Sequence, residues 1–167
     1  MPFPVARIPR SSFRKTDPHV KTLYFDSNYL FRLYSSEPGA PEVQKLAGQA
    51  ESLATAWHGR AELSSILLRK RREAALPDEV IEEIRLQIRD DVGLGLIGFL
   101  PLSEAVMSRL ESVLSSAPAN TNIRAADALH LACAAEHGFT EVHSNDRHFL
   151  AAAPLFGLRG INVIPSR

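Results

Sequence analysis

The sequence predicts a single α/β domain, a three-layer α/β/α sandwich built around a mainly parallel central sheet. Short β-type segments alternate with longer helical segments along the chain, and this alternation favours parallel strands joined by helical crossovers. The chain has 167 residues, of which 45% are apolar and 23% charged, so it has the size of one domain and can bury a core. Ligands of such sheets bind beyond the carboxyl ends of the strands, and functional residues are expected there.

Five strands are expected where short runs of apolar and β-branched residues lie between chain breaks. The first run, Thr22–Phe25, ends at Asp26, and the fourth run, Glu141–Ser144, ends shortly before Asp146. Three glycines between positions 93 and 98 loosen the chain before the third strand. The expected strands cover residues 22–25, 52–56, 99–102, 141–144 and 161–164.

Helices are expected between these strands, and several residues mark their ends. Pro41 suits the first turn of one helix, Pro77 ends another, and Asp78 suits the N-cap of the next. Ser103 suits a further N-cap, and Gly138 suits the C-cap of an Ala-rich helix. The expected helices cover residues 28–34, 41–50, 58–75, 78–91, 103–116, 123–137 and 147–153.

The first 20 residues predict a flexible basic tail, and the folded domain is expected at residues 21–167. This segment has four prolines and lacks the run of ~7–15 apolar residues that a secretory signal needs. Residues 1–21 carry five basic residues and one acidic residue, so their net charge is +4 and that of the remainder is −4. Bulk charge therefore does not indicate a nucleic-acid binder, and an anionic ligand would need local basic residues or a metal.

The sequence gives no sign of a membrane or an oxidising compartment. No apolar run approaches the ~20 residues that a membrane span needs. The one cysteine, Cys133, cannot form an internal disulfide. We therefore expect a cytoplasmic protein.

Four acidic residues occupy positions that a parallel sheet would bring to one edge. Asp26 ends the first strand, Glu62 lies near the start of the helix after the second strand, and Asp127 lies early in the Ala-rich helix. Asp146 follows the fourth strand. Each alone is commonly a cap, a turn residue or a solvated charge. Because strand ends and the starts of the following helices share one edge, we expect the four carboxylates to converge.

Asp127 is the most informative of the four, because its helix is otherwise nearly all apolar. A buried carboxylate costs free energy unless it is paired, hydrogen-bonded or bound to a metal. One alternative is a purely structural ion pair with Arg124, three residues earlier on the same face.

Converging carboxylates repel one another, and a divalent cation would let them stay ionised. Oxygen-only ligands favour Mg²⁺ or Mn²⁺ over zinc, and the scattered histidines show no zinc spacing. A metal held by carboxylates with open positions for phosphate is the apparatus of phosphodiester hydrolysis. The residues alone do not distinguish RNA from DNA as the substrate.

The chain resembles the PIN domain family in four segments that stand in the family's order. They are FDSNYL at 25–30, RAELSSIL at 60–67, RAADALHLACA at 124–134 and HSNDRHF at 143–149. The string ADALHLA is the most specific of them. The similarity spans about residues 22–164, and the family is a metal-dependent ribonuclease fold that includes the toxins of VapBC-type toxin–antitoxin pairs.

The resemblance implies RNA cleavage and a set of site residues. The family's four acidic positions match Asp26, Glu62, Asp127 and Asp146, so no catalytic carboxylate is missing. The first three would be the main ligands of Mg²⁺ or Mn²⁺, and Asp146 would hold a second ion or a bridging water. The family often has Thr where this chain has Ser144, and the hydroxyl is kept.

Polar neighbours of these carboxylates are weaker candidates. His130 is expected to be a core or groove residue, and the basic run containing Arg69 either contacts RNA or simply stabilises the end of its helix. Plain turn-capping is the alternative for the hydroxyl and amide residues. The candidates are Ser27, Asn28 and Ser144 for orienting the carboxylates, and Arg124 and Arg147 for contacting phosphates.

The resemblance also implies partners: an RNA substrate, a cognate antitoxin and a second copy of the chain in a homodimer. The antitoxin would place an Arg or Lys near the carboxylates and offset their repulsion. Its hydrophobic segment would lie in a groove that we place between residues 29–34 and 43–50, although apolar residues there suit the core equally well.

The leading hypothesis is therefore a metal-dependent endoribonuclease that acts as the toxin of a toxin–antitoxin pair. The alternative is a catalytically idle PIN-like module that binds RNA or protein, which the four intact carboxylates count against. A phosphatase of the haloacid-dehalogenase type also has an Asp at the end of the first strand, but it needs a second Asp where this chain has Asn28. A dinucleotide-binding fold is disfavoured because no G-x-G-x-x-G follows the first strand.

Overall fold

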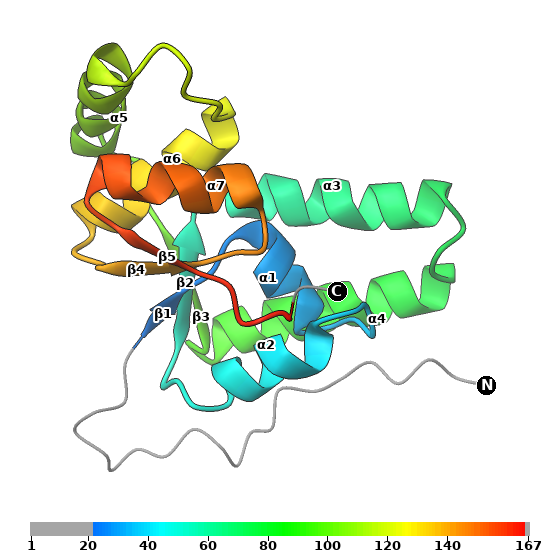
Figure 1. Cartoon of the computed structure of the whole chain (residues 1–167). Helices are drawn as coiled ribbons and strands as arrows, with labels where there is room; N and C mark the ends of the chain where they lie inside the picture. The colour runs from blue at the N-terminus through cyan, green and yellow to red at the C-terminus, as the bar shows by residue number, and fades with distance from the viewer. Residues whose placement is uncertain (1–21, 166–167) are drawn as a thin grey trace.

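The computed structural model describes residues 22–165, and the predicted tail at residues 1–20 lies outside them. Within the described part of the chain, five strands alternate with helices as the sequence predicts (Figure 1). The strands are β1 (Leu23–Tyr24), β2 (Leu53–Ala56), β3 (Ile97–Leu100), β4 (Glu141–His143) and β5 (Arg159–Ile161). The helices are α1 (Ser27–Arg32), α2 (Ala40–Ala47), α3 (Gly59–Arg72), α4 (Asp78–Gly93), α5 (Glu104–Ser116), α6 (Ala125–Glu136), α7 (Arg147–Ala152) and a short 3-10 helix (Ala153–Phe156).

All strand pairs are parallel, which confirms the predicted sheet. β1 pairs with β2 and β2 with β3, while β4 pairs with β5. The two groups are joined by a parallel bridge between Phe25 and His143 and by a 3.1 Å hydrogen bond from Asp26 N to His143 O. The spatial order is therefore β3-β2-β1-β4-β5. The chain moves away from β1 in one direction through β2 and β3 and continues on the other side with β4, so the strand order reverses between β1 and β4.

Side chains from the two faces of the sheet enter two separate cores, which makes the fold three layers thick. Tyr24 and Phe25 are adjacent and point to opposite faces, as residues of a strand must. Phe25 packs with residues of α1–α4, and Tyr24 packs with residues of α5–α7. Figure 1 shows these two groups of helices on opposite sides of the sheet.

Three polar residues cap helices: α5 and α7 begin where the sequence predicts, and α1 begins one residue earlier than predicted. Asp26 Oδ1 accepts from Tyr29 N at the start of α1, and Ser103 Oγ accepts from Val106 N at the start of α5. Asp146 caps α7. The predicted cap at Asp78 is wrong by one position: Pro77 is the N-cap of α4, and Asp78 lies in the first turn, where it pairs with Arg71.

Two strands begin two residues earlier than predicted. The third is Ile97–Leu100 instead of 99–102, because Pro101 has no N–H for the ladder, and its last pairing is the bond from Trp57 N to Leu100 O. The fifth is Arg159–Ile161 instead of 161–164. There Asn162 Oδ1 accepts from Tyr29 Oη and from Ile164 N, so the chain turns away from the sheet.

The predicted groove between residues 29–34 and 43–50 is wrong, because its apolar side chains belong to the core. Tyr29 and Leu33 are fully buried, and Leu46 is partly buried against the same cluster. Exposed apolar side chains instead include Trp57, 52% exposed, which borders a hollow between α3, α4 and β3. No helix of residues 22–165 is both long and apolar enough to cross a membrane.

Candidate active site

The candidate site begins at Asp26, which follows β1 at the point where the strand order reverses. Open parallel sheets bind ligands at such a point, since the connections leave it in opposite directions. The Asp26 carboxylate is 6% exposed, and it accepts from Tyr29 N at 2.7 Å and from Ser144 Oγ. Burial raises the pKa of Asp26 to about 6, although these two hydrogen bonds act in the opposite direction.

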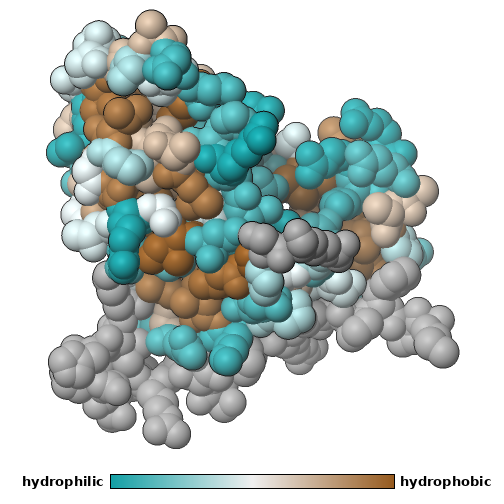
Figure 2. All heavy atoms as spheres, in the orientation of Figure 1, coloured by the Kyte–Doolittle hydropathy of each residue, from teal (hydrophilic) through white to brown (hydrophobic). Residues whose placement is uncertain are grey.

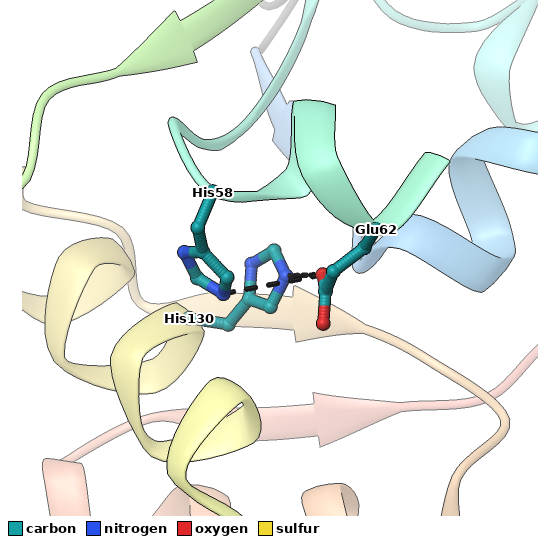
Figure 3. A group of neighbouring side chains, drawn as sticks. All are labelled: His58, Glu62 and His130. Atoms are coloured by element: carbon teal, nitrogen blue, oxygen red, sulfur yellow. Dashed lines mark hydrogen bonds and ion pairs between the residues drawn. The ribbon is translucent and has the colours of Figure 1, made fainter. Parts of the chain in front are cut away.

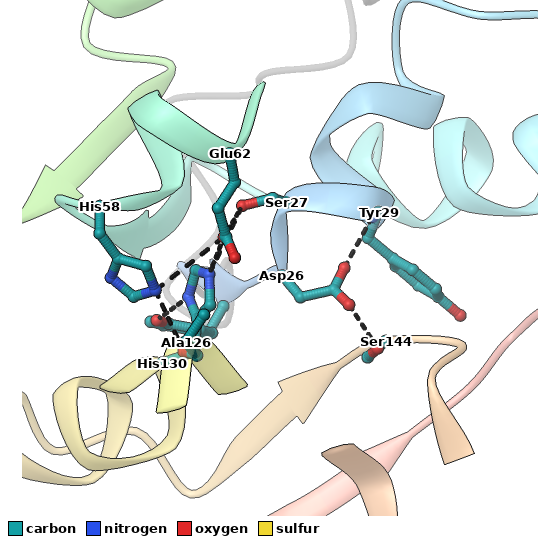
Figure 4. A network of polar contacts seen from close by, with 9 residues as sticks. Asp26, Ser27, Tyr29, His58, Glu62, Ala126, His130 and Ser144 are labelled. Atoms are coloured by element: carbon teal, nitrogen blue, oxygen red, sulfur yellow. Dashed lines mark hydrogen bonds and ion pairs between the residues drawn. The ribbon is translucent and has the colours of Figure 1, made fainter. Parts of the chain in front are cut away.

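Glu62 lies in the first turn of α3, on the other side of the same space (Figure 4). Its Oε2 accepts from Ser27 Oγ at 2.5 Å and lies 2.7 Å from His130 Nε2. Gly59 permits this close packing, because a Cβ there would lie 3.2 Å from Ser27 Oγ. Burial alone would raise the pKa of Glu62, but the His130 and Ser27 contacts outweigh it and hold that pKa at about 2.

Asp127 lies in the first turn of α6 and is half-buried. Burial raises its pKa, and the neighbouring charge of Asp146 raises it further. Among the described residues no ion pair joins Asp127 to Arg124, which is exposed. The purely structural ion pair that the sequence allowed is therefore absent from the described residues, and the more distant charge of Arg124 lowers the pKa of Asp127 less than burial raises it.

Asp146 has a different surrounding from the other three carboxylates. Its Oδ1 accepts from His148 N at 2.7 Å and from Phe149 N at 3.2 Å, as the N-cap of α7. Ser144 links it to Asp26, because Ser144 Oγ accepts from Asp146 N and donates to Asp26 Oδ2. Asp146 thus combines a capping role with a place near Asp127.

The structure brings three of the four carboxylates to one hollow. Figure 2 shows hydrophilic surface where the start of α7 approaches α3. The residues that line the hollow include Asp26, Ser27, Asn28, Glu62, Arg69, Arg124, Asp127 and His130. Asp146 and Arg147 line a neighbouring hollow, and Asn28 borders both. Such a hollow could bind a cation through its carboxylates and a phosphate group through its two arginines.

Sequence reasoning missed His58 and assigned no chemistry to His130. The nearest ring nitrogens of both lie close to Glu62 Oε2, His58 Nε2 at 3.9 Å and His130 Nε2 at 2.7 Å (Figure 3). His130 is buried as expected, and its Nδ1 lies 2.8 Å from Tyr24 Oη. One signal was present in the sequence: His58 stands four residues before Glu62, and residues at that spacing share a helix face.

The side chains at the hollow fit a hard divalent cation. Asp26, Glu62 and Asp127 offer only oxygen, the donor that Mg²⁺ and Mn²⁺ prefer. Glu62 Oε1 accepts no hydrogen bond from the described residues, so it is available to a ligand. Asp26 is a buried carboxylate whose pKa is raised, and a nearby cation would favour its ionised form.

Comparison with known proteins identifies one family. The sequence profile of the PIN domain family matches residues 23–154, which is most of the chain. No curated protein matches the chain.

Proposed function

The chain belongs to the PIN domain family, a nuclease fold, and from this premise we propose that it is a metal-dependent endoribonuclease that hydrolyses RNA phosphodiesters. The observation that carries the proposal is the meeting of Asp26, Glu62 and Asp127 at one hollow. They come from the end of β1 and from the first turns of α3 and α6. Three carboxylates that meet at one hollow repel one another, although His130 and His58 favour the charge of Glu62 and Arg124 favours that of Asp127. Holding them together is costly without a functional reason.

In this proposal Asp26, Glu62 and Asp127 hold Mg²⁺ or Mn²⁺, directly or through water. The cation would neutralise charge on the scissile phosphate and acidify the attacking water. Ser27 and Ser144 fix the carboxylates, because each hydroxyl donates to one of them. Each carboxylate oxygen that accepts one hydrogen bond keeps a second lone pair for a ligand.

Arg69 and Arg124 bind the RNA backbone on either side of the scissile bond. Both line the hollow that holds the carboxylates, and both are exposed. Arg147 would contact a further phosphate from the neighbouring hollow, where Asp146 lies. Asp146 would act on a second ion or on a bridging water, at a position from which it already influences the pKa of Asp127.

The direct test is cleavage of single-stranded RNA with and without a chelator. We expect EDTA to abolish cleavage and Mg²⁺ or Mn²⁺ to restore it, and Asp26→Asn to remove it in either ion. Asp90→Asn, at an exposed aspartate on α4, is the matched control and retains full activity. Full cleavage in EDTA contradicts the metal mechanism, and RNA binding without cleavage in every condition indicates the idle module.

We further propose that this ribonuclease is the toxin of a toxin–antitoxin pair, working in the cytoplasm as a homodimer. Its antitoxin would place an Arg or Lys among Asp26, Glu62 and Asp127, where a cation offsets the repulsion between carboxylates. The test is growth of cells that express the gene alone or together with its genomic neighbour. Arrest with the gene alone and rescue by the neighbour support the pair, and unimpaired growth on strong expression contradicts it.

A further inference from the structure

Beside the carboxylates, two imidazoles that the proposed reaction does not use meet the carboxylate of Glu62. We propose that His58, Glu62 and His130 form a second metal site, which binds a borderline transition-metal ion of the Zn²⁺ class and shares Glu62 with the first. The ligand atoms would be His58 Nε2, Glu62 Oε2 and His130 Nε2, and all three lie within 4.8 Å of one another.

The geometry is close to what three ligands of one small ion require. Zn²⁺ lies ~2.0–2.2 Å from imidazole nitrogen and carboxylate oxygen, so two of its ligand atoms lie roughly 3–4 Å apart. Glu62 Oε2 is 3.9 Å from His58 Nε2 and 2.7 Å from His130 Nε2. The side chains approach from the start of α3 and from α6 (Figure 3). A small outward movement of Glu62 from His130 would open the space for the ion.

The donor set separates this site from the acidic one by chemistry. Imidazole nitrogen suits Zn²⁺, whereas Mg²⁺ prefers oxygen and keeps much of its water. Two histidines and one glutamate leave a fourth position open, the arrangement of three-ligand zinc sites.

A neighbouring hydroxyl is placed to support one of the two imidazoles, that of His130. With the ion on Nε2, the proton of His130 lies on Nδ1 and is donated to Tyr24 Oη, 2.8 Å away. His58 Nε2 now lies 3.1 Å from Ala126 O, and its buried Nδ1 has no hydrogen-bond partner among the described residues. The ion would replace the contact to Ala126 O, whereas Nδ1 of His58, which the ion does not reach, has no hydrogen-bond partner among the described residues in either state.

The shared glutamate makes the second site inhibitory, a consequence that rests on the proposed ribonuclease function. An ion held through Glu62 Oε2 takes the place of the His130 contact to that oxygen and moves the carboxylate away from His130, while the hydrogen bond from Ser27 can remain. It also places a positive charge next to the acidic site, which disfavours a second cation there. Zn²⁺ is therefore expected to slow cleavage that Mg²⁺ supports.

The binding test uses the untagged full chain and two probes, Co²⁺ for its visible absorption and Zn²⁺ for calorimetry, both in excess Mg²⁺. We expect one tightly bound ion with the absorption of nitrogen-ligated, low-coordinate Co²⁺. His58→Gln should weaken it at least tenfold, since loss of even an outer partner costs 10- to 100-fold in metal affinity. His137→Gln, at an exposed histidine on the far end of α6, is the matched control and leaves binding unchanged.

The outcomes separate this proposal from the proposed function. Absence of binding, or binding that Asp26→Asn abolishes and His58→Gln does not change, overturns the second site, whether or not the protein cleaves RNA. If the chain shows no cleavage at all, the Co²⁺ spectrum still shows whether His58, Glu62 and His130 bind a metal ion. In the active protein, Zn²⁺ should inhibit, and His58→Gln should shift the inhibiting concentration upward at least tenfold. Binding at His58 without inhibition overturns the competition for Glu62.

Discussion

Replacing Asp26 with Asn should stabilise the metal-free protein at neutral pH, although Asp26 is one of the best-connected side chains of the site. Burial raises the pKa of Asp26 from its ordinary 3.8 to about 6. A pKa difference of about 2, at ~1.36 kcal/mol per unit, corresponds to about 3 kcal/mol. The side chain is 6% exposed, so solvent screening reduces this figure little.

The direction of the pH dependence follows from the raised value. The folded protein binds the Asp26 proton more tightly than the unfolded chain does, so this contribution to stability is complete below pH ~4 and is lost as pH rises to ~6. Asn cannot ionise, so the Asp26→Asn variant does not lose this stability as the pH rises. Its carbonyl oxygen can still accept from Tyr29 N, while the bond from Ser144 must rearrange at a cost of about 1 kcal/mol.

The net expectation is a free energy of unfolding about 1–2 kcal/mol higher for Asp26→Asn than for the natural protein at pH 7. This corresponds to a rise in Tm of roughly 2–8 °C for a chain of this length. At pH 4 the difference should vanish or reverse. Thermal or urea unfolding in EDTA between pH 4 and 8 measures it, with the exposed Asp90→Asn as control. A lower Tm for Asp26→Asn across the whole range would refute the reasoning and assign Asp26 a structural role.

Three further predictions concern other residues of the site. Asp127→Asn should unfold in metal-free buffer at a midpoint no lower than the natural protein, because burial raises the pKa of Asp127, while RNA cleavage falls by about a hundredfold or more. Tyr24→Phe removes the hydroxyl beside His130 Nδ1, and His130 in turn contacts Glu62. The variant should lose about 1 kcal/mol in the free energy of unfolding and about tenfold in the rate of cleavage. An unchanged cleavage rate would show that the hydroxyl does not act through His130 on Glu62. Arg69→Ala should weaken binding to single-stranded RNAs of all sequences alike and reduce the slope of log K against log salt by about 0.7, and a sequence-dependent loss in binding titrations would contradict a phosphate contact.

Much of the fold follows from local signals in the sequence. The alternation of short strands and helices predicts the parallel sheet, and the helices after Ser103 and Asp146 begin where they are expected. The third and fifth strands begin two residues earlier than the sequence predicts. Pro101 is a local signal for the end of the third strand, whereas the end of the fifth depends on a non-local contact. Asn162 turns the chain through a bond to Tyr29, which stands more than a hundred residues earlier.

The site could be predicted only in outline. Sheet topology brings strand ends and helix starts to one edge, and the positions of Asp26, Glu62 and Asp127 at that edge follow from it. The opposite pKa shifts of Asp26 and Glu62 do not, because they depend on burial and on which neighbours donate hydrogen bonds. The proximity of His58 to His130 likewise requires the packing of α6 against the start of α3, since 72 positions separate the two residues.

The contrast between Asp26 and Glu62 indicates where a cation matters most. Two imidazoles accompany Glu62, and their contacts hold its pKa at about 2. Asp26 accepts from a hydroxyl and a backbone N–H, and His130 also favours its charge, yet its pKa is about 6. The partners of Glu62 thus outweigh its burial, whereas those of Asp26 offset its burial only in part. A divalent cation near both carboxylates therefore lowers the cost of ionising Asp26 more than that of ionising Glu62. Metal binding should raise the free energy of unfolding of the natural protein more than it raises that of the Asp26→Asn variant.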